Sequence, residues 1–182
     1  MKFKLVKMSL ALLTVAAIVS FSSCGRTKTR KIEDEAASST EKVMLFNGKD
    51  LSNWAFLLKD PSVVASEVFT IKNDVIHISG DPFGYMRTKE VYSNYALHVE
   101  WRYPAEATNS GVFIHVQQPD TIWPECIEIQ LKAGDAGDLL CMGGSDMNER
   151  TDKSTRVVAK LTESAEKPVG EWNKMEIICI SD

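Results

Sequence analysis

The sequence lacks the motifs that identify several common enzyme classes. It contains no glycine-rich phosphate loop, no H-E-x-x-H pair and no G-x-S-x-G elbow. Nucleotide-dependent, zinc-protease and serine-hydrolase activities therefore have no motif support. Its four cysteines include no C-x-x-C pair and have no histidine at zinc-ligand spacing. We accordingly expect no resident cofactor and no metal site, while a divalent metal stays open as an alternative electrophile.

The chain also lacks an excess of basic residues. Its 21 basic and 25 acidic side chains give a formal charge of −4, and residues 1–24 hold three of the lysines and no acid. Without those residues the charge is −7, from 18 basic and 25 acidic side chains. Nucleic-acid surfaces need basic patches, so we expect no nucleic-acid partner. The basic cluster at residues 26–31 fits a solvated tether that is attracted to anionic headgroups.

No apolar stretch is long enough to span a bilayer as a helix, which takes about 20 residues. The uncharged apolar residues 8–21 follow three lysines and precede the small residues before Cys24, as in a signal peptide. The segment FSSC-G around Cys24 resembles a bacterial lipobox, in which the cysteine is acylated and becomes the mature N-terminus. We predict a lipoprotein signal peptide at residues 1–24, lipidation at Cys24, and location in the cell envelope, on the periplasmic or outer-membrane face. The alternative is an ordinary secretory signal that is cleaved near Cys24.

Two further regions follow this segment. Residues 25–42 are rich in charge, serine and threonine and show no hydrophobic period, so we predict a flexible linker. Residues 43–182 have the length of one domain. The last predicted strand reaches the end of the chain with nothing after it to pair with, so a sandwich that ends in its own core strand and a domain that is incomplete at its C-terminus both fit; the family resemblance described below favours the incomplete domain.

Lipidation of Cys24 would leave three cysteines in a compartment that permits disulfides, so at most one pair can form. We expect these three to be small, half-buried apolar side chains instead: Cys126, Cys141 and Cys179.

Short segments of alternating polarity predict an all-β domain. Residues 95–103 place apolar side chains on one face and polar ones on the other. The dipeptide Asn73-Asp74 separates two apolar segments and predicts a hairpin turn. Many short strands with turn residues between them indicate an antiparallel sandwich or barrel. Further strands are predicted at residues 69–71, 75–78, 112–117, 127–131, 156–161 and 175–180.

Six motifs occur in order along the chain. They are LFNGKDLSNW (45–54), GYMRT (84–88), YALHVEWR (95–102), NSGVFI (109–114), EIQ (128–130) and GEWN (170–173). In this order the set closely resembles the 3-keto-disaccharide hydrolase domain family, over about residues 43–180. The resemblance implies a concanavalin A-like antiparallel jelly-roll sandwich and a sugar-cleaving activity in an exported protein. Members of the family usually continue beyond the GEWN segment, and they often carry Arg where this chain has His115.

Residues two apart on a strand share a face, which groups the polar side chains of three strands. If these strands are neighbours in one concave sheet, they line a groove with groups that bind sugar hydroxyls and move protons. The same pattern also fits solvated strand faces with weak ion pairs. The three sets are Glu100 with Arg102, Glu128 with Gln130 and Lys132, and Phe113 with His115 and Gln117.

An ordinary glycosidase needs two carboxylates that flank the scissile bond, and the 127–131 strand supplies one. A 3-keto sugar relaxes this requirement. Its ketone acidifies the hydrogen on carbon 2, so one base can drive loss of the aglycone from carbon 1 before water adds. The resulting hypothesis assigns the base to Glu128 or His115, enolate stabilisation to Arg102 or a divalent metal, and sugar orientation to Glu100 or Gln130. The predicted substrate-binding set is Gln130, Tyr85, Lys132 and Asn109.

A second function class stays open beside the enzyme. A lipid-anchored carbohydrate-binding module could use the same groove without turnover, since jelly rolls host lectins as well as enzymes. A third possibility is an incomplete groove that neither binds nor cleaves. The family resemblance favours the enzyme, and product formation from a 3-keto-disaccharide discriminates between the first two.

Overall fold

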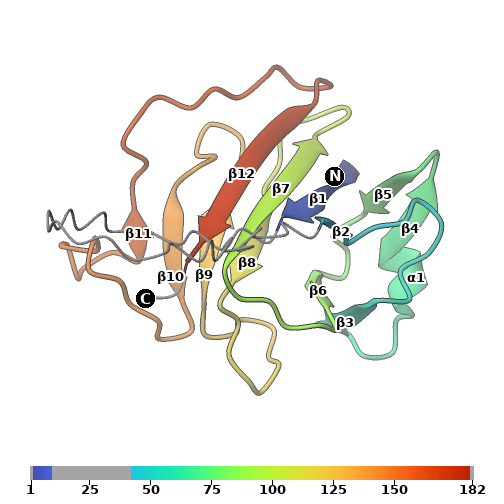
Figure 1. Ribbon diagram of the computed structural model, residues 1–182, viewed down its shortest axis with the longest axis horizontal. Coiled ribbons are helices and arrows are strands. Elements are labelled where there is room, and N and C mark those ends of the chain that lie inside the picture. Colours follow the sequence, from blue (N-terminus) through green and yellow to red (C-terminus); the bar gives the residue numbers. More distant parts are fainter. Residues whose placement is uncertain (1, 10–41, 181–182) are drawn as a thin grey trace, which may run out of the picture.

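Alternating apolar side chains place β7 (Tyr95–Arg102) in the middle of the fold, where the sequence predicts a strand. The structure, a computed structural model that describes residues 2–9 and 42–180, contains two main antiparallel sheets. Strands of the two sheets lie behind one another in Figure 1, where β12 and β7 stand in front of β8 and β9. The chain is thus an antiparallel all-β sandwich, as expected.

The larger sheet has the order β12-β7-β1-β5-β4, and β2 pairs with β1. Besides β7, its strands are β1 (Lys2–Ser9), β2 (Lys42–Met44), β4 (Phe69–Lys72), β5 (Val75–Ile78) and β12 (Asn173–Cys179). The hairpin between β4 and β5 turns at Asn73 and Asp74, whose φ angles are 54° and 56°. Positive φ at both central residues is typical of a two-residue hairpin turn, so this prediction is confirmed.

The second main sheet has the order β11-β10-β9-β8. Its strands are β8 (Gly111–Ile114), β9 (Cys126–Gln130), β10 (Leu139–Met142) and β11 (Val157–Val158). A separate hairpin pairs β3 (Trp54–Leu58) with β6 (Gly84–Thr88), and the helix α1 (Ala65–Val68) is a single turn. The sequence prediction missed β2, β3, β6 and β10.

The core lies between the two main sheets. Val99 and Trp101 from β7 pack with Ile129 of β9 and with Leu131 just after it, and all four are at most 5 % exposed. Because these side chains point inward, the alternate residues on both strands point away from the sandwich on opposite sides. Cys126, Cys141 and Cys179 are buried and free, in agreement with the sequence prediction.

Two predicted strands are shorter than expected. β8 ends at Ile114 instead of continuing to residue 117, because His115 adopts a φ of 55° that takes the chain out of the extended conformation. β11 contains two residues where residues 156–161 were predicted. Trp54 is buried and its indole nitrogen donates to the Leu45 carbonyl at 2.9 Å, which gives this side chain a structural role.

Strand β1 comes from the segment that the sequence assigns to a signal peptide. It lies between β7 and β5, antiparallel to both, and Leu5 is in register with Val99. Cys24 and the predicted linker up to residue 41 lie outside the described residues. Within the described part of the chain, no helix has the length and apolarity needed to cross a membrane.

Candidate functional site

The outer face of the β8–β11 sheet carries a groove of about 570 Å³. Glu128 and Gln130 of β9 point to this face because Ile129, which lies between them, packs in the core. Loops at both ends of β8 and β9 close the groove on its sides. Its lining combines polar and apolar side chains, among them Asn109, Phe113, Trp123, Glu128, Gln130, Met142 and Arg156.

Glu128 lies in the middle of the groove wall and is only 9 % exposed. Its carboxylate sits directly over Gly111 of the neighbouring strand, because a Cβ added to Gly111 would be 2.1 Å from Glu128 Oε1. Burial raises the pKa of the Glu128 carboxyl, and the positive charge of Arg156 partly opposes this effect. A buried carboxyl with a raised pKa beside a cation is suited to proton transfer at neutral pH.

Arg156 precedes β11 and brings a cation to the same groove. Its Nη1 donates to the sulfur of Met142 at 3.4 Å, which holds the guanidinium along β10. A guanidinium in this place can stabilise negative charge that develops on a bound carbonyl oxygen. The sequence prediction treated residue 156 only as the start of a strand and missed this role.

Gln130 and Asn109 line the end of the groove opposite the β8–β9 loop. The side-chain oxygen of Gln130 accepts hydrogen bonds from the backbone N–H groups of Leu131 and Lys132, at 3.0 and 2.9 Å. These two bonds fix the amide, and its NH₂ group is left to donate into the groove. The structure therefore places Gln130 and Asn109 with Glu128, as the predicted site requires.

Aromatic rings form the other end of the groove. Trp123 in the β8–β9 loop is 58 % exposed and stacks on Phe83, with ring centroids 5.5 Å apart and an interplanar angle of 25°. Lys59 Nζ lies 4.7 Å from the centre of the Phe83 ring. An exposed tryptophan in a groove offers a flat apolar surface of the type on which sugar rings stack.

Tyr85 and His115 lie outside this groove. Both line a second, largely apolar cavity of about 600 Å³. The Tyr85 hydroxyl donates to Asp120 Oδ1 at 3.3 Å, and its ring meets Phe113 edge-on with centroids 5.6 Å apart. His115 is exposed at the end of β8, where its positive φ breaks the alternation that would have aligned it with Phe113. His115 therefore does not line the groove with Glu128.

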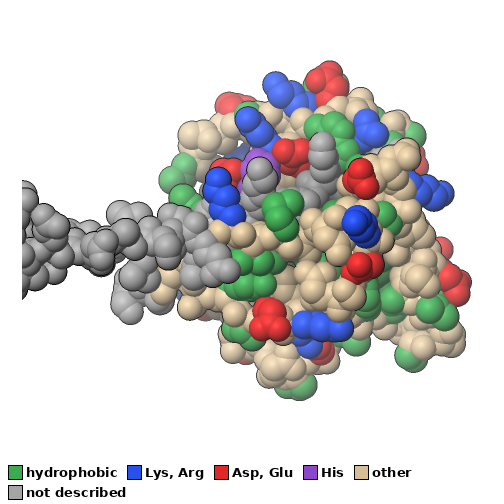
Figure 2. All heavy atoms as spheres, turned by 45° about the vertical axis from the view of Figure 1, so that its right-hand side comes forward, with side chains coloured by type: hydrophobic (Ala, Val, Ile, Leu, Met, Phe, Trp, Pro, Cys, Tyr) green, Lys and Arg blue, Asp and Glu red, His purple; other side chains and the backbone are tan. Residues whose placement is uncertain are grey.

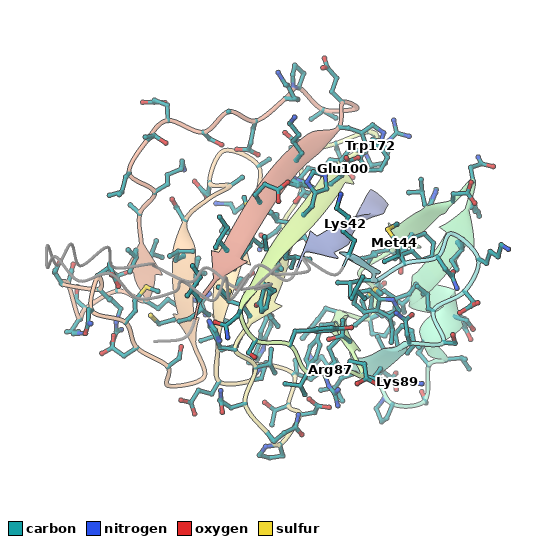
Figure 3. The ribbon with its side chains drawn as sticks, in the orientation of Figure 1. Lys42, Met44, Arg87, Lys89, Glu100 and Trp172 are labelled. Atoms are coloured by element: carbon teal, nitrogen blue, oxygen red, sulfur yellow. The ribbon has the colours of Figure 1, made fainter. Side chains whose placement is uncertain are left out.

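Glu100 and Arg102 lie on the opposite side of the sandwich from Glu128. Their strand parity is as predicted, but β7 belongs to the other sheet, so its polar face points away from the groove. Figure 3 shows Glu100 beside Trp172 near one end of β7 and β12. Arg102 stacks over Trp172 at 4.9 Å and donates to the Gly170 carbonyl at 3.2 Å. The expectation that these two side chains share a trough with Glu128 is corrected by this geometry.

Glu100 takes part in a different cluster on that outer face. His98 Nε2 is 3.0 Å from Glu100 Oε1, and His98 Nδ1 contacts Glu176 Oε1. Hydrogen bonds to these two carboxylates raise the pKa of His98. Figure 2 shows acidic and basic side chains interspersed over the face that it presents.

Lys132 keeps the parity of Gln130 but does not line the groove. Its Nζ pairs with Asp135 Oδ2 at 2.5 Å in the turn after β9. Within the described residues, no group of three or more His, Cys, Asp or Glu side chains is arranged to hold a metal ion. The groove thus combines one buried carboxyl, one guanidinium, two side-chain amides and an aromatic wall: Glu128, Arg156, Gln130, Asn109 and Trp123 with Phe83.

Comparison with known proteins found a family model that matches most of the chain. Residues 41–182 match the family model of the 3-keto-alpha-glucoside-1,2-lyase-like domain. The match covers the β-sandwich from β2 to β12 and includes every residue that lines the groove. Comparison with curated proteins and with solved structures gave no significant match.

Proposed function

The chain belongs to the 3-keto-alpha-glucoside-1,2-lyase-like domain family, a family of carbohydrate-acting enzymes, and on this basis we propose that it cleaves 3-keto-glycosides. The observation that carries the proposal is the composition of the groove. Among the described residues that line it, Glu128 supplies the one carboxylate. Ordinary retaining or inverting glycosidases use two carboxylates on either side of the bond. A 3-keto substrate needs a single base.

The proposed reaction proceeds by elimination and hydration. The base removes the hydrogen on carbon 2, and the electron pair of that C–H bond forms an enolate with the ketone at carbon 3. The enolate then forms the carbon 1–carbon 2 double bond as the bond from carbon 1 to the aglycone oxygen breaks. The aglycone leaves with a proton, and water adds across the double bond to give the free 3-keto sugar. The net change is hydrolysis, and no oxocarbenium ion is required.

The groove supplies a group for each demand of this reaction. Glu128 is the base, and its raised pKa makes the carboxylate a stronger base near neutral pH. Once protonated, it is the nearest source of the proton that the aglycone oxygen requires. Arg156 stabilises the enolate oxygen, a role that the sequence hypothesis had given to Arg102. Gln130 and Asn109 orient the sugar hydroxyls.

The proposal also places the protein outside the cytoplasm. A basic segment, an apolar run and small residues before Cys24 support an exported lipoprotein whose lipid is attached at Cys24. Metabolic labelling with a radioactive fatty acid tests this point. Label should enter the wild-type protein and be absent from Cys24→Ala. Labelling that survives this substitution would refute acylation at Cys24.

Turnover of a 3-keto-disaccharide by the Glu128→Gln variant tests the catalytic proposal. Loss of the base should lower kcat by about 10²–10⁴-fold. Two matched controls remove a carboxylate elsewhere: Glu125→Gln on the exposed side of the β8–β9 loop, and Glu100→Gln on the opposite face of the sandwich. Both should retain wild-type turnover. Unchanged turnover in Glu128→Gln would exclude Glu128 as the base.

The same assay separates the enzyme from a binding module. The exposed Trp123 is the observation that favours binding, because such platforms also occur in lectin sites. If the wild-type protein binds a 3-keto-disaccharide or its unoxidised parent but releases no free sugar, the catalytic proposal fails. The non-catalytic carbohydrate-binding module is then the correct description.

A further inference from the structure

We propose that Trp123 and Phe83 form a stacking subsite for a ring in the leaving group of the glycoside, and that the Asp120–Arg87 pair holds this subsite in position. The inference rests on the proposed function, because it assigns one end of the Glu128 groove to the aglycone. It also narrows the substrate class to glycosides whose leaving group contains a sugar ring or an aromatic ring.

Trp123 is placed to receive such a ring. One face of its indole stacks on Phe83 at 5.5 Å, yet 58 % of the residue is exposed. Burial of a tryptophan ring is normally favourable, so an ordered and exposed indole at the edge of a polar groove indicates a surface that is covered in a complex. Sugar C–H faces and aromatic aglycones both bind to surfaces of this kind.

The length of the groove matches two rings. The β8–β9 loop carries Trp123 and joins β9 at Cys126, whereas Asn109 lies at the other end, beside Gln130. At about 3.3 Å per residue, the strand from Cys126 to Gln130 spans about 13 Å. Glu128 lies halfway along it. A sugar ring that is bound by Gln130 and Asn109 therefore has its bond to the leaving group near Glu128, and the leaving group extends toward Trp123.

Asp120 fastens the loop that carries Trp123. Arg87 Nε lies 3.1 and 3.0 Å from its two carboxylate oxygens, and Arg87 Nη2 donates to Oδ2 at 2.6 Å. Tyr85 and Gln118 also donate to Oδ1, at 3.3 and 3.2 Å. Such a bidentate guanidinium–carboxylate pair fixes orientation as well as distance.

The pair connects the two halves of the platform. Arg87 and Tyr85 belong to β6, and Phe83 directly precedes that strand. Asp120 and Trp123 belong to the same loop. Anchoring Asp120 to β6 therefore keeps Trp123 in stacking distance of Phe83. Asp120 is a positioning residue, and it does not line the groove.

Steady-state kinetics with three 3-keto-glucosides test the subsite: a methyl glycoside, a disaccharide and a 4-nitrophenyl glycoside. The Trp123→Ala variant should raise KM about three- to tenfold for the two ring-bearing substrates relative to the methyl glycoside, the magnitude of one aromatic stacking contact. Trp123→Phe should restore most of the difference. Asp120→Asn should give the same pattern with a smaller amplitude. If the subsite accepts only pyranose rings, Trp123→Ala should raise KM for the disaccharide alone. If it accepts only aromatic rings, the same variant should raise KM for the nitrophenyl glycoside alone.

Trp172→Ala is the matched control, because this tryptophan stacks on Arg102 on the other face of the sandwich. The Trp172→Ala variant should have the same ratios between the three KM values as the wild-type protein. Equal effects of Trp123→Ala on the methyl and ring-bearing substrates would overturn the subsite. If Asp120→Asn keeps the wild-type ratio of KM between the ring-bearing substrates and the methyl glycoside, Asp120 does not position the subsite.

A binding measurement separates this inference from the proposed function. Calorimetric titration of an unoxidised disaccharide involves no turnover, so its result does not depend on the reaction. Weaker binding to Trp123→Ala than to wild type and Trp172→Ala supports the subsite even if no 3-keto substrate is cleaved. Equal affinity of all three proteins, together with cleavage that Glu128→Gln abolishes, would refute the subsite and leave the catalytic proposal intact.

Discussion

Glu128 occupies the space that a side chain on Gly111 would need. A Cβ at residue 111 would lie 2.1 Å from Glu128 Oε1 and 2.7 Å from its Cδ. The glycine of the NSG segment is thus a steric requirement of the buried carboxylate on the next strand. The requirement comes from contact across the sheet, since no positive φ is recorded for Gly111.

Gly111→Ala should therefore reduce activity more than stability. The methyl group displaces the Glu128 side chain from its Cγ, 2.7 Å away, to its carboxylate, which moves the base away from the substrate while the two strands stay paired. We expect kcat for a 3-keto-disaccharide to fall by about 10²-fold, the effect of a misplaced catalytic group, with little change in Tm. Kinetics and thermal melting of the same preparation measure the two effects.

Gly84→Ala is the matched comparison for that substitution. Its Cβ would lie 2.1 Å from the backbone oxygen of Leu57, and backbone cannot move aside as a carboxylate can. The free energy of unfolding of this variant should fall by about 1–3 kcal/mol, as expected for overpacking. If Gly111→Ala loses as much stability as Gly84→Ala, the carboxylate at residue 128 is not free to shift.

The pH dependence of stability should reveal the buried carboxyl. Burial raises the pKa of Glu128 in the folded protein, so the folded state keeps a proton that the unfolded chain has already released. The stability from this proton is fully present below the unfolded pKa of about 4.3. It is lost as pH rises through the raised folded pKa.

Glu128→Gln should accordingly become more stable than wild type as pH rises through this window, because the amide never ionises. Urea unfolding at a series of pH values measures the difference in unfolding free energy. Glu125→Gln is the control for loss of a carboxylate from an exposed position near the same strand. A difference between wild type and Glu128→Gln that stays constant from pH 4 to 8 would contradict a raised pKa.

The His98 cluster should stabilise the fold in acid rather than in base. Both ring nitrogens of His98 face carboxylates, those of Glu100 and Glu176, so both must carry protons to donate. The raised pKa means that this stabilisation is complete below the unfolded value of about 6.5 and disappears as pH rises through the folded value. Lys174 is in register with Glu100 and also faces this cluster.

His98→Gln should lower Tm below pH 6.5, and the gap to wild type should close as pH rises. The effect is limited to a few degrees because the Glu176 side chain is 60 % exposed and solvent screens its charge. Melting curves from pH 5.5 to 9 test this prediction. A gap that widens with pH would show that His98 is neutral in the folded protein.

Proline substitutions in β1 test its place in the sheet. Leu5 is in register with Val99 of β7, whereas Val6 lies at the register shift between Leu5 and Met8. Proline removes a backbone donor in the middle of a sheet but is tolerated at irregular positions. In the full chain produced without export, Leu5→Pro should lower Tm by roughly 5 °C or more, and Val6→Pro should lower it less. Equal Tm values for Leu5→Pro and wild type would show that β1 does not hold the sheet together.

Local sequence patterns were sufficient to predict single strands and turns. The alternation in residues 95–102 reports which side chains of β7 are buried, and Asn73-Asp74 reports a hairpin because both residues tolerate positive φ. Such patterns act over a few neighbouring residues. They carry no information on which sheet a strand joins, and therefore Glu100 and Arg102 were assigned to the same trough as Glu128.

The candidate site also shows what local sequence patterns can and cannot predict. Glu128 and Gln130 were predicted together because residues two apart on a strand share a face, and Asn109 belonged to the predicted substrate-binding set. Arg156 reaches the groove through the pairing of β11 with β10, which joins residues far apart in the sequence. His115 was misplaced by a single dihedral angle, which strand parity cannot report.

The position of β1 has a consequence for the time course of biogenesis. Among the described strands, β7 and β5 are both paired with β1 and not with each other, so this one segment joins the two parts of the larger sheet. A signal peptide must be accessible to the translocation machinery and its peptidase. If Lys2–Ser9 serves in export, folding in the cytoplasm would hide it within the sheet, so secretion has to be faster than folding. Cleavage of that segment would leave the edges of β7 and β5 that paired with β1 open to water and to pairing with another extended chain.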